Sequence, residues 1–117
     1  MFEKLDVYQK AIDIADRIAS FTEQFPRGYR YLSDQLNRAA VSIATNIAEG
    51  NGRFTKPDRR NFFHIARGSV QECVPLLELA RRQDLIKAEQ LDALKDELEV
   101  IARMISGLIS GLDKQSP

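Results

Sequence analysis

The sequence predicts an all-α protein, an antiparallel up-down four-helix bundle. Apolar residues recur at helical spacings along nearly the whole chain, and short connections rich in Gly, Pro and polar residues separate four such segments. No segment shows the alternation that is typical of a strand. With 117 residues the chain is long enough for one hydrophobic core and too short for two. We therefore expect one domain over residues 1–117, with helices at about 6–24, 31–49, 56–82 and 88–112.

The first expected helix, residues 6–24, carries two neighbouring apolar rows. The core row has alternating spacings of four and three, which place its side chains on one side of a helix. Its members are Val7, Ala11, Ile14, Ile18, Phe21 and Phe25, and the second row contains Leu5, Tyr8, Ile12, Ala15 and Ala19. Pro26 and Gly28 then end the helix.

The second expected helix, residues 31–49, ends at a glycine. Its core row is Leu32, Leu36, Ala39, Ile43 and Ile47. Gly50 follows directly, and we expect it to adopt the left-handed conformation that commonly lies just past a helix end.

The third and fourth expected helices show the same periodicity. Thr55 can cap the third helix, with Asp58 completing a capping-box pattern. Apolar rows in this helix begin at Phe62 and Phe63, and we expect both rings to lie in the core. The fourth helix keeps a seven-residue repeat of Leu91, Leu94, Leu98, Ile101, Ile105, Leu108 and Leu112, with Val100, Met104 and Ile109 beside it.

The extra apolar rows on the first and fourth helices predict a homo-oligomer. A helix in a bundle needs only one apolar face, so further apolar residues are expected to lie between subunits. The alternative is a wide core within a single subunit.

Composition excludes several classes of protein. No apolar run is long enough to cross a membrane, and residues 1–6 do not resemble a signal peptide, so we expect a cytoplasmic protein. Cys73 is the single cysteine, which excludes an internal disulfide and a cysteine-cluster zinc site. The sequence contains no phosphate-binding loop, metal-ligand motif or paired catalytic groups, and we expect no catalytic residue, metal or cofactor.

Positive charge is concentrated around the predicted turn between the second and third helices. Although the chain is neutral overall, residues 26–67 contain eight Lys or Arg and three Asp or Glu. Five of these cations are candidate contacts to nucleic acid: Arg53, Lys56, Arg59, Arg60 and Arg67. Phe54 is the best candidate in the turn for an exposed aromatic that stacks on a base. An alternative is a protein-only ring in which these arginines form ion pairs between subunits.

The polar residues around the same turn have a structural interpretation. Glu49 lies in the last turn of its helix, where the dipole disfavours a negative charge, so we expect it to pair with Arg53. Asn46 can tie the backbone of the turn, and Ser69 and Glu72 are further candidates for one polar network.

A second alternative is a ribonuclease. Arg59 and His64, with four residues between them, resemble the Arg–His signature of the all-helical HEPN ribonucleases. In that family the arginine would hold a phosphate and the histidine would help to activate a ribose hydroxyl. Five positions on a helix align two side chains poorly on one face.

Residues around the turn also resemble a known family, the four-helix-bundle proteins encoded by intervening sequences of bacterial 23S rRNA genes. The opening residues 2–11 resemble the start of the family. The most specific part is Asn46 to Gly50 with Gly52 and Arg53, followed by Phe62, Ile65 to Arg67, Gly68, Ser69 and Glu72.

The resemblance implies a homo-oligomeric ring, typically a pentamer, without established catalytic residues. Its relatives include the accessory variability protein of diversity-generating retroelements, which implies nucleic acid and a reverse transcriptase or another protein as partners. Those relatives are strongly basic, whereas this chain is neutral with a pI near 6.6, and this departure argues against nucleic-acid binding. From the residues and the resemblance together we expect a non-enzymatic scaffold or adaptor, whose anionic partner, if it has one, is RNA or DNA at the basic turn.

Overall fold

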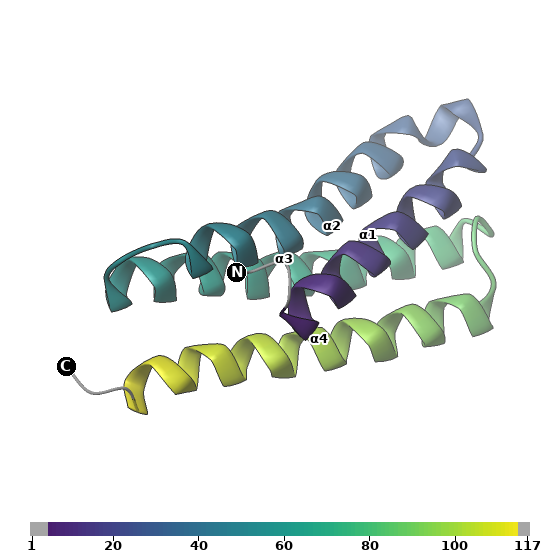
Figure 1. The fold of residues 1–117 in the computed structure, drawn as a ribbon. Helices are drawn as coiled ribbons and strands as arrows, with labels where there is room; N and C mark the ends of the chain where they lie inside the picture. Colours follow the sequence, from purple (N-terminus) through teal and green to yellow (C-terminus); the bar gives the residue numbers. More distant parts are fainter. Residues whose placement is uncertain (1–4, 115–117) are drawn as a thin grey trace.

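The computed structural model describes residues 5–114, which form four α-helices. They are α1 (Asp6–Glu23), α2 (Arg30–Asn51), α3 (Lys56–Arg82) and α4 (Ala88–Lys114), with a short 3₁₀ turn, η2 (Arg27–Tyr29), before α2 (Figure 1). No strand occurs among the described residues. The all-α class with four helices is confirmed, and the predicted bounds agree to within two residues. Residues 2–4 of the opening resemblance lie outside the described part.

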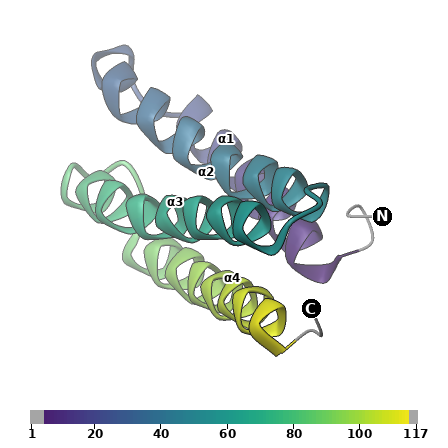
Figure 2. The same ribbon diagram turned by 90° about the vertical axis from the view of Figure 1, so that its left-hand side faces the viewer.

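The helices pack into an elongated body about 51 Å long. Each helix contacts the next in sequence, and α1 also contacts α4. Figure 2 shows α3 lying between α2 and α4. One flank of α3 therefore meets the end of α2, where the candidate site lies, and the other flank meets α4.

The core follows most of the predicted apolar rows. Val7, Ala11, Ile14 and Ile18 of α1 are buried, as are the five predicted residues of α2. Phe21 and Phe25 of α1 and Leu91 and Leu108 of α4 are only half-buried. The larger difference lies in α3, whose buried face runs between its two predicted rows. It consists of Phe63, Ala66, Ser69, Val70, Cys73, Leu77 and Ala80. Phe63 is thus a core residue, but Phe62 is only half-buried and the prediction that it belongs to the core is wrong.

The second apolar rows lie outside this core to different degrees. On α1, Ile12 is 40% exposed and Ala19 is exposed, whereas Tyr8 and Ala15 are half-buried. On α4, Val100 is 36% exposed. The bundle does not fully cover these rows by itself.

The end of α2 differs from the prediction. Gly50 lies inside the helix and is buried, and no described glycine has a positive φ. Space is the reason for glycine here, because a Cβ at position 50 would lie 2.6 Å from Cε1 of Phe63 and 3.2 Å from the carbonyl oxygen of Arg59. Gly50 therefore permits the close approach of α2 and α3.

Replacing Gly50 with Ala should destabilise the fold. Phe63 is buried and the Arg59 carbonyl is fixed in the backbone, so overpacking should cost about 1–3 kcal/mol, from which up to about 1 kcal/mol of helix propensity is recovered. Gly107→Ala is the matched control, because no atom lies within 4 Å of a Cβ there. The free energy of unfolding of this control should rise by up to about 1 kcal/mol through the higher helix propensity of Ala. Urea unfolding measures both variants, and a Gly50→Ala protein as stable as the parent would contradict the packing argument.

Cys73 is a buried free thiol in the middle of α3. Burial, and to a smaller extent the charge of Glu72, raises its pKa from 9.0 to about 12. The unfolded chain therefore loses this proton at a lower pH than the folded chain does. The resulting stability is fully present below pH 9 and is lost as the pH rises towards 12.

The free energy of unfolding should accordingly fall between pH 9 and 12, by up to about 1.4 kcal/mol per pH unit from this thiol. A Cys73→Ala variant lacks the titrating group and should show a shallower decline, whatever its stability at neutral pH. Equal slopes for parent and variant in urea unfolding over this pH range would show that Cys73 makes no such contribution.

Candidate nucleic-acid interface

The turn between α2 and α3 is short and is held by backbone hydrogen bonds. Gly52 N–H donates to the carbonyl oxygens of Ala48 and Glu49, each at 3.2 Å, and Arg53 N–H donates to Gly50 O at 3.3 Å. Thr55 caps α3 as predicted, since its Oγ1 accepts a hydrogen bond from Asp58 N–H at 3.2 Å. These contacts fix where the side chains of residues 53–60 lie.

Arg53 forms the predicted ion pair with Glu49. Its Nη2 lies 3.0 Å from Oε2 of Glu49, one turn back along the chain. The guanidinium also lies over the ring of Phe62, with Cζ 4.6 Å from the ring centroid. A cation above an aromatic face is attracted by the ring quadrupole. This contact explains why Phe62 is half-buried at the surface of the turn.

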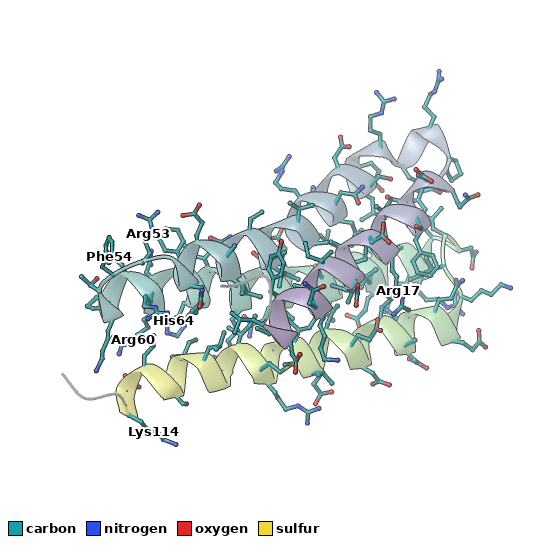
Figure 3. The ribbon with its side chains drawn as sticks, in the orientation of Figure 1. Arg17, Arg53, Phe54, Arg60, His64 and Lys114 are labelled. Atoms are coloured by element: carbon teal, nitrogen blue, oxygen red, sulfur yellow. The ribbon has the colours of Figure 1, made fainter. Side chains whose placement is uncertain are left out.

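Arg59 holds the end of α2. Its Nη2 donates a hydrogen bond to the carbonyl oxygen of Asn51 at 3.3 Å, where the last residue of the helix lacks a helical donor. Its Nε is buried and has no hydrogen-bond acceptor in the part of the chain that the structure describes. Arg59 is therefore directed into the contact between α2 and α3, whereas His64 is exposed (Figure 3).

The other candidate cations differ in their surroundings. Arg60 joins α3 to α4 through an ion pair with Asp113 at 2.5 Å. Lys56 is half-buried and has an interaction within the chain. Arg67 is exposed and forms no ion pair with any residue of 5–114. The structure thus brings Arg53, Arg60 and His64 to one end of the bundle, where Lys114 also lies (Figure 3).

Phe54 is fully exposed at the outer edge of the turn. Figure 3 shows it beside Arg53 at the end of the bundle. An open groove next to the ring is lined by Ala48, Glu49, Gly52, Arg53, Phe54, Thr55 and Asp58. The predicted exposure of this aromatic is confirmed.

A polar network crosses from α2 to α3 further from the turn. Asn46 Nδ2 lies 2.8 Å from the carbonyl oxygen of Ser42 and 2.9 Å from its Oγ. Ser69 Oγ lies 2.8 Å from Ser42 Oγ and 3.1 Å from the carbonyl oxygen of Ile65. Each hydroxyl has one hydrogen, so all contacts are satisfied when Asn46 donates to Ser42, Ser42 to Ser69, and Ser69 to Ile65.

This network changes the interpretation of the signature residues. Both hydrogen bonds of the Asn46 amide go to Ser42, which lies one turn earlier in the same helix, so the expectation that Asn46 ties the turn is wrong. Ser69 is a member as predicted, whereas Glu72 is exposed and forms no hydrogen bond with the described residues. Ser42 was not predicted from the sequence, although its position four residues before Asn46 is a usable signal. Gly68 is exposed, and a Cβ there would meet no atom within 4 Å.

Residues 5–114 contain neither a cluster of metal ligands nor a membrane-spanning helix. No group of three or more His, Cys, Asp or Glu residues lies close enough together to hold a metal ion there. None of the helices in this range is long and apolar enough to span a membrane.

Comparisons with known proteins agree with the four-helix fold. The family model described as 23S rRNA-intervening sequence protein matches residues 3–107. The fold is similar to that of a protein of unknown function from the S23 ribosomal protein family of Bacteroides thetaiotaomicron. The TM-score is 0.81 and the sequence identity 26%, over 88% of this chain and 97% of that chain. The comparison with curated proteins gave no match.

The matched range includes α1, α2, the turn and α3, and extends into α4. The resemblance seen around Asn46 to Glu72 therefore reflects common membership, and the chain belongs to the 23S rRNA-intervening sequence protein family.

Proposed function

We propose that this protein is a non-enzymatic scaffold that associates with copies of itself and binds RNA or DNA at the turn between α2 and α3. Under this proposal an antiparallel up-down bundle is the subunit of a pentameric ring in the cytoplasm. The observation that carries the proposal is the second apolar row of α1, in which Ile12 is 40% exposed. A helix whose apolar row continues outside its own core is suited to packing against another subunit.

The position of Arg59 supports a non-enzymatic role. A ribonuclease of the Arg–His type needs both side chains to reach one phosphodiester. Arg59 instead donates to the carbonyl oxygen of Asn51 and is partly buried, while His64 is exposed five positions further along α3. The arginine thus has a structural task that competes with holding a phosphate.

Phe54 favours nucleic acid as the ligand of the turn. A fully exposed aromatic ring beside several cations is suited to stacking on an unpaired base. The charge available is modest, because Glu49 and Asp113 pair with Arg53 and Arg60. We therefore expect weak binding to single strands, dominated by stacking at Phe54 and by Arg67.

The contrasting proposal is a ring that binds only proteins, with the arginines pairing between subunits. Arg67 supports it, because this exposed cation lacks an ion pair within residues 5–114. The two proposals differ in whether the assembled protein binds an oligonucleotide.

Self-association is tested by the mass of the protein in solution. Sedimentation velocity and native mass spectrometry should show an assembly, with five copies as the expected number. Ile12→Glu should weaken it, because a charge would enter an apolar contact. A parent protein that stays monomeric at every accessible concentration would overturn the scaffold proposal.

Oligonucleotide binding is tested by fluorescence anisotropy with single-stranded RNA and DNA at low salt. Phe54→Ala should weaken binding by roughly 5- to 150-fold, the range expected for loss of one stacked base. Arg67→Ala should lower both the affinity and its dependence on salt.

Arg82→Ala, at the opposite end of α3, is the matched control and should bind as the parent does. If the assembled parent binds neither oligonucleotide at low salt, the ring binds only proteins. Loss of the assembly in Arg67→Ala would favour the same conclusion.

A further inference from the structure

The outer face of α2 carries a regular set of exposed side chains. Tyr31, Asp34, Arg38 and Val41 recur at spacings of three, four and three, which places them in one stripe along the helix. All four are exposed, with Tyr31 at 54% and Val41 at 52%. The buried residues of α2, such as Leu36 and Ile43, lie on the opposite side. The stripe therefore points away from the core of the subunit.

The two charges of this stripe have no ion-pair partner among residues 5–114. Asp34 and Arg38 are four residues apart on one helix, a spacing that permits an ion pair, yet they form none with each other or with any other residue of 5–114. Ion pairs between helices do occur in this protein, as in Arg17 with Glu97 and Lys95 with Glu78, but none involves this face of α2 among residues 5–114. The α2 stripe thus presents an unpaired acid and an unpaired base between two large exposed side chains.

The order of these four residues is self-complementary. From the N-terminal to the C-terminal end of the stripe, the side chains are apolar, acidic, basic and apolar. Read from the other end, the order is the same except that the acidic and basic side chains change places. A second α2 laid antiparallel across the first, about a two-fold axis at the level of residue 36, therefore puts Asp34 opposite Arg38 twice. It also puts Tyr31 opposite Val41 twice. A contact of this kind is isologous, with the same patch used by both copies.

We propose that α2 is a two-fold docking surface on which a second copy of this chain packs through the same stripe. Charge complementarity selects the antiparallel arrangement, because a parallel one would place Asp34 against Asp34 and Arg38 against Arg38. Tyr31 and Val41 supply the apolar contacts at both ends. The contact is independent of the ring proposed above, since a two-fold axis produces pairs and cannot close five subunits.

The contact is small, so it is weak between two isolated chains. Four side chains per copy bury less surface than a stable dimer requires. Five such contacts acting together between two rings would be much stronger through multivalency. The surface is therefore suited to joining rings face to face, or to forming a dimer at high concentration.

Complementary charge reversals test this surface. Asp34→Arg makes both charges of the stripe positive, and Arg38→Asp makes both negative, so each variant alone should repel its own copies. Each should weaken the pairing by roughly tenfold or more, since two ion pairs become like-charge contacts. An equimolar mixture of the two variants should pair again, and so should the double variant that carries both reversals. Arg103→Asp, an exposed reversal on α4, should leave the pairing unchanged.

Sedimentation velocity and native mass spectrometry separate the outcomes. We expect the parent to be an assembly of two or ten copies. The single variants should contain one or five copies, respectively, and the mixture of the two variants should recover the larger assembly. A parent of five copies that is unaffected by all reversals overturns the α2 contact and leaves the ring in place. A parent dimer that obeys the reversals overturns the ring and leaves the α2 contact in place. A mixture that pairs no better than its components also overturns the α2 contact.

Discussion

The close approach of α2 and α3 at Gly50 and Phe63 governs the geometry of the turn. Because residue 50 has no side chain, the buried ring of Phe63 can pack directly against the α2 backbone. Arg59, one turn earlier on α3, is then close enough to bond the carbonyl oxygen of Asn51. The four-residue connection between the helices is short for the same reason. A wider separation would remove both contacts and would move Phe54 relative to the cations around it.

Electrostatics around the turn follow from this packing. The sequence shows a cluster of positive charge, but the fold brings acidic partners to it from two directions. Glu49 comes from the preceding helix, and Asp113 comes from the end of α4, 53 residues away from Arg60. The positive charge available to a ligand is therefore smaller than the linear count suggests. Under the proposed function, the exposed ring of Phe54 would supply correspondingly more of the contact to a base.

Local patterns in the sequence predicted the helices, the Thr55 cap and the Glu49–Arg53 pair, because each depends on residues within one or two turns. Apart from Asn46, which bonds Ser42 within α2, the errors concern contacts between helices. Gly50 has the position of a helix-ending glycine, yet its role depends on Phe63, which no local pattern connects to it. Whether Phe62 or Phe63 enters the core depends on how α3 is rotated about its axis. The Ser42–Ser69 contact between α2 and α3 is consistent with the rotation that buries Phe63. No local pattern indicates that Arg59 bonds Asn51 or that Arg60 pairs with Asp113, because both contacts join different helices.

The hydrogen-bond chain from Asn46 through Ser42 to Ser69 has an evolutionary consequence. Each hydroxyl in it accepts from one neighbour and donates to the next, so replacing one member leaves a half-buried donor or acceptor without its partner. Replacing the set together with apolar residues of similar shape avoids that penalty. Substitutions at these three positions should therefore be accepted in combination, and lineages that lose Ser42 should also change Ser69.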